Sequence, residues 1–133
     1  MKKADRQKIQ DKFGGLCAYS GTALESDWQP DHIKPVLRCS FTGKMINPEN
    51  DNIDNMIPCQ SAINHYKGAL DIETFRSWYV AGLHDRLKKL PKNPKTKKSM
   101  RRKEYMLRIA GYFGITEDKP FSGIFYFETL NIT

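Results

Sequence analysis

The stretch "QPDHIKPV" at residues 29–36 places the strongest limit on the secondary structure that the middle of this chain can form. Pro30 and Pro35 bracket an acid and an imidazole, Asp31 and His32. Proline removes a helical hydrogen bond and clashes with the preceding turn, so the stretch predicts a short strand rather than a helix. Because neighbouring residues on a strand point to opposite faces, Asp31 and His32 are expected to project to opposite sides.

The rest of the chain is predicted to form short elements separated by turns. Residues 16–24 fit either a hairpin or a loop, and "GIFYFETL" at residues 123–130 predicts a further strand. Helices are expected at residues 3–13 and 61–67, from Asp71 through Leu87, and at about 99–113, with a strand at Met56-Ile57. Helical spacing assigns the core-facing side of the last two helices to Ile72, Phe75, Trp78, Tyr79, Leu83, Leu87, Met106, Ile109, Ala110 and Phe113.

Positive charge is concentrated in one segment, "KKLPKNPKTKKSMRRK" at residues 88–103, called the basic segment below. It holds nine of the 22 basic residues and no acidic one, whereas 13 basic and 15 acidic residues remain elsewhere. Two prolines and the lack of apolar periodicity predict a loop. A dense basic loop is typical of phosphate-binding surfaces, although a solvated linker has the same composition. The residues expected to contact nucleic acid there are Lys92, Lys95, Lys97, Lys98, Arg101 and Arg102.

Composition also bears on the compartment. The 133 residues are about the size of one domain, and no long apolar run or signal peptide is present, so neither a membrane span nor export is predicted. Cys17, Cys39 and Cys59 are an odd number without paired spacing, which disfavours a disulfide scaffold and fits a reducing cytosol. We therefore expect a cytoplasmic protein, either a monomer or a homodimer.

Residues able to do chemistry gather between positions 31 and 68. Asp31 offers carboxylate oxygens, and His32 a side chain that can act as a base near neutral pH. Downstream, "DNIDNMIPCQSAINHYKG" at residues 51–68 supplies amides, a histidine and a lysine. Oxygen donors with one imidazole suit Mg²⁺ or Mn²⁺ better than a soft metal. A cation held by Asp31 would leave His32 on the other side of a phosphate, where it could activate water.

At these residues the chain resembles the HNH family of ββα-metal endonucleases. Three pieces of the motif occur in order: "PDHIKP" at 30–35, "NIDNMIP" at 52–58 and "NHYKG" at 64–68. The resemblance implies one α+β domain over residues 1–133. It also implies that the protein acts in a bacterial or phage-infected cell. Its ββα core, two short strands and a helix, would span about residues 15–70, flanked by N- and C-terminal helices and a basic extension over about 71–133.

The resemblance implies a metal-dependent DNA endonuclease that leaves 5′-phosphate and 3′-hydroxyl ends. Asp31 and Asn64 would hold one divalent cation, Mg²⁺ or Mn²⁺. His32 would be the general base that takes a proton from the attacking water. Asn55 would fix the loop at the first strand and orient the imidazole through a hydrogen bond. Lys67 would contact the nucleic acid, which is expected to be double-stranded DNA.

The residue on the helix that holds the cation is either Asn64 or His65. Neighbours on a helix differ in direction by about 100°, so both are not expected to reach one ion. The spacing to Lys67 and Gly68 favours Asn64.

The cysteines depart from the family pattern, in which two Cys-x-x-Cys pairs often bind a structural zinc. Cys17 is followed three residues later by Ser20, and Ile63 occupies a position of the second pair. A four-cysteine site cannot form, so no structural zinc is expected. Cys17 and Cys59 are predicted to be small apolar packing residues instead.

Two other classes of function compete with the nuclease. One is a non-catalytic nucleic-acid-binding module on the same scaffold, and the other is a protein-interaction domain, which the basic segment disfavours. A module that had lost catalysis would be expected to lose Asp31, His32 or Asn64, and all three are present. We also expect Asp31→Ala to abolish cleavage but leave the protein folded, because a carboxylate at an ion site destabilises the ion-free fold.

Overall fold

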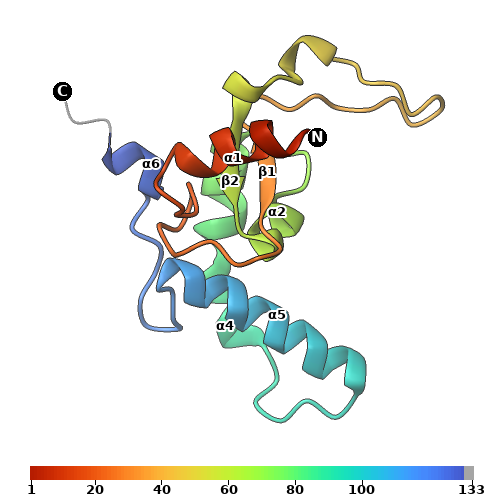
Figure 1. Ribbon diagram of the computed structural model, residues 1–133. Helices are drawn as coiled ribbons and strands as arrows, with labels where there is room; N and C mark the ends of the chain where they lie inside the picture. Colours follow the sequence, from red (N-terminus) through yellow and green to blue (C-terminus); the bar gives the residue numbers. More distant parts are fainter. Residues whose placement is uncertain (131–133) are drawn as a thin grey trace.

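Residues 1–130 are described by a computed structural model, in which helices from both ends of the chain surround a small antiparallel sheet (Figure 1). The domain is a small α+β fold, as predicted. In chain order the elements are α1 (Lys3–Asp11), β1 (Gln29–His32), η1 (Pro48–Asn50), η2 (Ile53–Asn55), β2 (Met56–Cys59), α2 (Ser61–Lys67), α3 (Ile72–Thr74), η3 (Phe75–Val80), α4 (Leu83–Lys89), α5 (Lys97–Phe113) and α6 (Tyr126–Thr129).

The sheet and α2 form the predicted ββα core. β1 pairs antiparallel with β2, in a register that places Asp31 opposite Ile57 and His32 opposite Met56. α2 follows β2 almost directly and ends at Gly68, whose φ of 60° suits glycine. β1 is shorter than predicted, because the chain leaves the sheet after His32.

A dense aromatic core holds the helices to the sheet. Tyr19, from the loop before β1, packs edge-on against Phe125, with ring centroids 5.1 Å apart. Phe75 stacks on the same ring at 5.8 Å. A smaller cluster under α1 joins Ile9, Trp28 and Met56. The residues predicted to face inward from α5, Met106, Ile109 and Ala110, are buried, and Phe113 packs at the edge of the core.

The helix predicted after Asp71 is interrupted by the π-helical segment η3. The backbone N–H of Ala81 donates to the carbonyl of Arg76, five residues earlier, which widens the turn and rotates the following residues. Trp78 and Tyr79 are therefore 71% and 37% exposed, and Val80 is buried in their place. The prediction that Trp78 and Tyr79 face the core is wrong, whereas Phe75, Leu83 and Leu87 are buried as predicted.

The predicted strand at residues 123–130 is wrong, because this segment contains the short helix α6. Glu128 accepts a hydrogen bond from the backbone N–H of Phe125 at 2.8 Å and so caps the helix. The same carboxylate binds the guanidinium of Arg76. The alternation of apolar residues resembles a strand, but these contacts with η3 favour a helix.

The basic segment is only partly the loop that was predicted. α4 runs to Lys89, and α5 begins at Lys97 after a cap in which Thr96 accepts from the N–H of Ser99. Lys and Arg are good helix formers, so the basic run forms the first turns of α5, ahead of its apolar face. The ammonium of Lys103 donates to the carbonyls of Pro91 and Lys92, both at 2.9 Å, and folds the connection back on α5.

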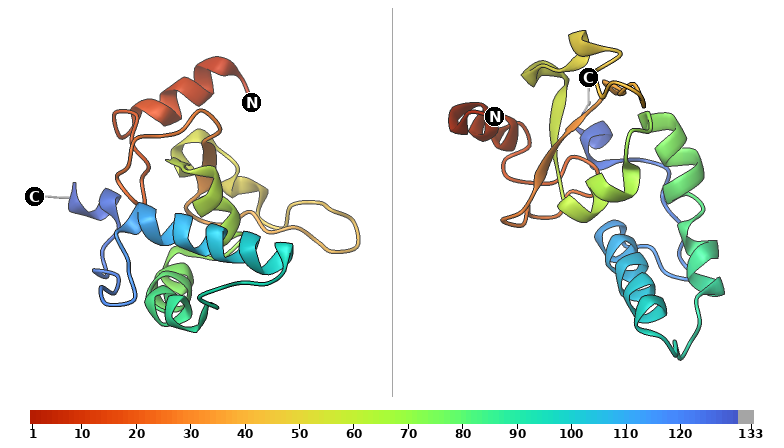
Figure 2. Two further views of the ribbon diagram at one scale, coloured as in Figure 1. Left: turned by 90° about the horizontal axis from the view of Figure 1, so that it is seen from below. Right: turned by 90° about the vertical axis from the view of Figure 1, so that its right-hand side faces the viewer.

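Two parts of the chain project from the body on the same side. One is the connection after β1, residues 33–47, called the arm below, and the other is the basic segment. In Figure 1 the arm projects at the upper right and the basic segment lies at the lower right, with α2 between them, and the right-hand view of Figure 2 shows the same order. Of the helices within residues 1–130, none has the length and apolar composition needed to cross a membrane.

Candidate functional site

A cavity of about 320 Å³ lies between the end of β1 and the end of α2. It brings together Asp31 and His32 from the strand and Asn64 from the helix, three of the residues predicted from the sequence. Its remaining wall is formed by the first residues of the arm and by the chain around Gly68. The cavity therefore joins the first and third pieces of the sequence motif at one place.

Asp31 points into the protein, as the strand alternation predicts, and is 5% exposed. Its carboxylate accepts a hydrogen bond from the Tyr19 hydroxyl and lies 3.1 Å from the ammonium of Lys67. Burial, and next the negative charge of Asp31, raise the pKa of Tyr19 well above its usual value, so this hydroxyl stays protonated and donates. The ion-free protein thus already balances the charge of Asp31.

Lys67 is the second half of this buried pair, and it is only 2% exposed. Its ammonium also lies 3.4 Å from the backbone carbonyl of His32. The charged group of Lys67, which was predicted to contact nucleic acid, faces Asp31 from inside the protein, and Lys67 also lines the cavity. Lys67 comes one helical turn after Ile63, on the buried side of α2, and this is why it reaches inward.

His32 points the other way and is half-buried. Its Nε2 lies 2.9 Å from Oδ1 of Asp51. An ionised carboxylate only accepts hydrogen bonds, so Nε2 carries the hydrogen in this pair. In the neutral imidazole the lone pair is then on Nδ1, which is the form that a general base requires.

Asp51 is the functional candidate that the sequence did not reveal. It lies just after η1, in a turn-rich stretch that also contains Glu49 and Asp54. Nothing in the local sequence distinguishes Asp51 from these two acids. Only the fold of the connection between β1 and β2 selects it as the partner of His32.

Asn55 fixes the loop, as predicted, but it does not bond to the imidazole. Its Oδ1 accepts from the N–H of Lys34 at 3.0 Å, and its Nδ2 donates to the carbonyls of Lys34 and Asn50. It therefore ties the segment that follows His32 to the segment that precedes Asp51. The predicted hydrogen bond from Asn55 to His32 is wrong, and the orienting contact comes from Asp51 instead.

The structure places the adjacent residues Asn64 and His65 in different surroundings. Asn64 lines the cavity beside Asp31. His65 is exposed and packs edge-on against Tyr105 of α5, with ring centroids 5.9 Å apart. Asn64 is thus the residue of the two that lies with Asp31 and His32.

Asp31 and Asn64 together offer oxygen donors of the kind that suits a hard cation. Mg²⁺ usually keeps several waters and takes one or two carboxylates together with substrate phosphates. A carboxylate has about four lone-pair positions, so Asp31 can serve Tyr19, Lys67 and a cation at once. Within residues 1–130 no three His, Cys, Asp or Glu side chains gather into a larger metal cluster. An ion here would depend on Asp31, Asn64 and groups of the substrate.

The predicted nucleic-acid-binding residues of the basic segment lie outside the cavity. They are on the connection after α4 and on the first turns of α5, and all are exposed: Lys92, Lys95, Lys97, Lys98, Arg101 and Arg102. Within the described part of the chain none of these six forms an ion pair, so their charge is available to a partner.

Cys17 and Cys59 are fully buried in the main core, as predicted for packing residues. Burial raises the pKa of the Cys59 thiol well above its usual value. Cys39 lies apart from both, on the arm.

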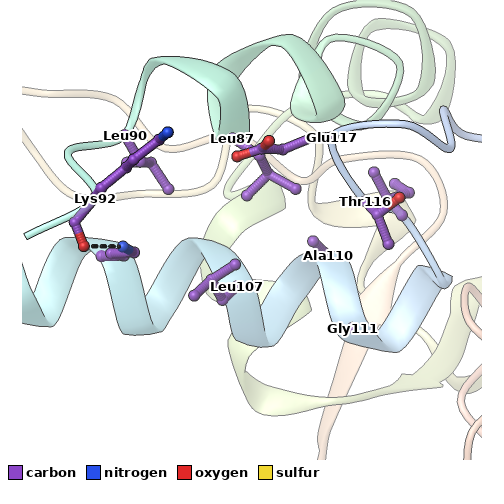
Figure 3. A pocket seen from close by; sticks show the side chains of 10 residues that line it. Leu87, Leu90, Lys92, Leu107, Ala110, Gly111, Thr116 and Glu117 are labelled. Carbon is purple, nitrogen blue, oxygen red and sulfur yellow. Dashed lines mark hydrogen bonds between the residues drawn. The ribbon is translucent and has the colours of Figure 1, made fainter.

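A second cavity, of about 270 Å³, lies between α4 and α5 and has mainly apolar walls, including Leu87, Leu107 and Ala110 (Figure 3). Lys103 borders it, but its ammonium is already bonded to backbone carbonyls. The cavity contains no counterpart of the Asp31, His32 and Asn64 grouping, so the site at the end of β1 is the better candidate for chemistry.

Comparisons with protein-family models, with curated proteins and with solved structures gave no match. The function must therefore be inferred from the arrangement of these side chains.

Proposed function

We propose that this protein is a metal-dependent DNA endonuclease of the HNH type. The observation that carries the proposal is the meeting of Asp31, His32 and Asn64 at one cavity, with the His32 imidazole held by Asp51. A carboxylate, an amide and an oriented base are the groups that metal-assisted phosphodiester hydrolysis requires.

His32 would activate the attacking water. With Nε2–H donated to Asp51, Nδ1 accepts the proton as the water attacks phosphorus. The carboxylate of Asp51 then stabilises the imidazolium that forms. Asn55 joins the segment after His32 to the segment before Asp51, so the imidazole need not be ordered when the substrate binds.

Asp31 and Asn64 would hold the divalent cation, whose charge stabilises the phosphate in the transition state and the leaving 3′-oxygen. Lys67 keeps the Asp31 carboxylate in place from within the protein and restrains the strand at the His32 carbonyl. Attack of water at phosphorus with departure of the 3′-oxygen leaves 5′-phosphate and 3′-hydroxyl ends.

A supercoiled-plasmid assay tests the proposal directly. With Mg²⁺ or Mn²⁺ the protein should convert supercoiled DNA into nicked or linear forms, and EDTA should stop the reaction. Ends that DNA ligase can reseal would identify 5′-phosphate and 3′-hydroxyl products. His32→Ala, purified in the same way, controls for contaminating nucleases. If the parent binds the plasmid but does not cut it with either ion, the protein is a non-catalytic nucleic-acid-binding module instead.

The basic segment should contribute affinity rather than chemistry. Replacing Lys95, Lys97 and Lys98 with alanine should weaken binding to unrelated duplexes alike, because these side chains neutralise phosphates. The slope of log affinity against log salt should flatten by roughly 1 to 3 units, and turnover at saturating DNA should change little.

A matched control removes three lysines at the start of the chain, two in α1 and one at its N-cap; α1 lies on the far side of the sheet from α2 (Figure 2). Replacing Lys2, Lys3 and Lys8 with alanine lowers the net charge by the same amount and should change the salt slope less. An unchanged slope in the basic-segment variant would make that segment a bystander. A collapse of saturating turnover with unchanged affinity would place one of its lysines in the active site.

A further inference from the structure

The arm is a hydrogen-bonded ribbon rather than a loose loop. The N–H groups of Cys39, Ile46 and Asn47 donate to carbonyls on the opposite side of the ribbon at 2.8–2.9 Å. Its base is held by Asn50, which donates to the carbonyl of Pro35. Asn55 also holds it, by accepting from the N–H of Lys34 and donating to the carbonyl of Lys34. The arm is therefore ordered before any partner binds.

The tip of this ribbon presents an aromatic side chain to solvent. Phe41 is 96% exposed, and Leu37 and Ile46 are also exposed along the ribbon. The turn closes at Gly43, with a φ of 70° that favours glycine. Within residues 1–130 Phe41 is almost fully exposed and so has little packing role, and an aromatic side chain on an ordered, projecting tip is well placed to contact a partner.

The charge of the arm indicates the class of partner. Residues 33–47, "IKPVLRCSFTGKMIN", contain Lys34, Arg38 and Lys44 and no acidic residue. The guanidinium of Arg38 donates to the carbonyl of Gly43, which places a positive charge next to the tip. A basic ribbon with an apolar tip is complementary to a groove of a duplex, whose walls are phosphates and whose floor is stacked bases.

The base of the arm belongs to the candidate site. Pro35, Val36 and Leu37 line the same cavity as Asp31 and His32. Leu37 has a positive φ of 50°, which is strained for a leucine and turns the ribbon where it leaves the cavity. A duplex with a phosphate at the cavity would therefore have the arm beside it, on the side away from the basic segment (Figure 1).

We infer that the arm enters a groove of duplex DNA next to the cleavage site and inserts Phe41 between neighbouring base pairs. This inference rests on the proposed function for its partner. Insertion of an apolar side chain partly unstacks a base step and kinks the duplex, which would open the backbone beside the cavity.

The test uses duplexes that carry 2-aminopurine at successive positions around the mapped cut, with EDTA present to prevent cleavage. Binding of the parent should raise the fluorescence of the probe at one base step, because an unstacked 2-aminopurine emits more strongly. Phe41→Ala should lose this rise and bind about 5- to 150-fold more weakly. Phe41→Trp should keep the rise, because tryptophan can also stack.

Trp78→Ala is the matched control, because it removes another exposed aromatic side chain, one that lies on η3 and away from the arm. It should leave both the fluorescence and the affinity unchanged. A parent that cuts DNA but raises the fluorescence at no position overturns the insertion and leaves the endonuclease standing. The insertion is also overturned, and the endonuclease is left standing, if Phe41→Ala behaves as the parent does or changes only self-association of the free protein. A parent that neither binds nor cuts duplex DNA overturns both proposals.

Discussion

His32→Ala should slow cleavage by at least about 100-fold while DNA affinity and folding stay close to those of the parent. The side chain is half-buried and touches Asp51 through one nitrogen, so its loss leaves no buried charge behind. The measurement is the single-turnover rate of plasmid nicking with Mg²⁺ at saturating protein, with affinity measured separately in EDTA. A variant that cuts at the rate of the parent would remove His32 from the mechanism.

A substitution of Asp51 tests whether His32 is a catalytic base or an ordinary surface histidine. If Asp51 acts by orienting His32, Asp51→Ala should slow cleavage in the parent but cause no further loss in the His32→Ala background. Asp54→Ala is a suitable control, because it removes a nearby carboxylate that does not contact the imidazole. Equal losses from Asp51→Ala in both backgrounds would show that Asp51 acts independently of His32.

Asp31→Ala should lose both cleavage and stability. The expectation from the sequence, that this variant folds normally, does not hold for a carboxylate that balances a buried lysine. Removing one partner of a buried ion pair costs about 3–5 kcal/mol in the free energy of unfolding, because the other charge is left uncompensated. Urea unfolding of the parent and the variant, followed by circular dichroism, measures this difference.

A second variant keeps the catalytic part of this prediction testable even if Asp31→Ala does not fold. Asp31→Asn combined with Lys67→Met removes both charges while preserving volume, and Asn can still accept from Tyr19. This double variant should recover most of the stability and still fail to cut DNA. Cleavage at the parental rate would exclude Asp31 from the site, and parental stability of Asp31→Ala would exclude a buried pair with Lys67.

The parts of the fold that local sequence decides could be predicted. The prolines of residues 29–36 exclude a helix there, Gly68 ends α2, and the three motif pieces predict that Asp31, His32 and Asn64 meet. The first two features depend on backbone preferences within a few residues, and the third follows from the resemblance of the three motif pieces to a known arrangement.

The parts that tertiary contacts decide could not be predicted. The helical form of residues 126–129 depends on the contact of Glu128 with Arg76, 52 residues away. Likewise Asp51 is one acid among several until the fold brings it to His32. Lys67 carries a charge that usually lies at the surface, and its burial is explained only by Asp31, which faces α2 from β1.

The bonds of Asn55 and Lys67 bear on how such a domain would change under relaxed selection. Asn55 holds two backbone segments together and Lys67 neutralises a buried carboxylate, so a descendant without the proposed activity would still need both in order to fold. The same is true of Asp31. His32 and Asn64 carry no comparable structural burden and would be free to drift. The presence of these two side chains is therefore the part of the motif that supports the proposed activity and that the architecture does not require.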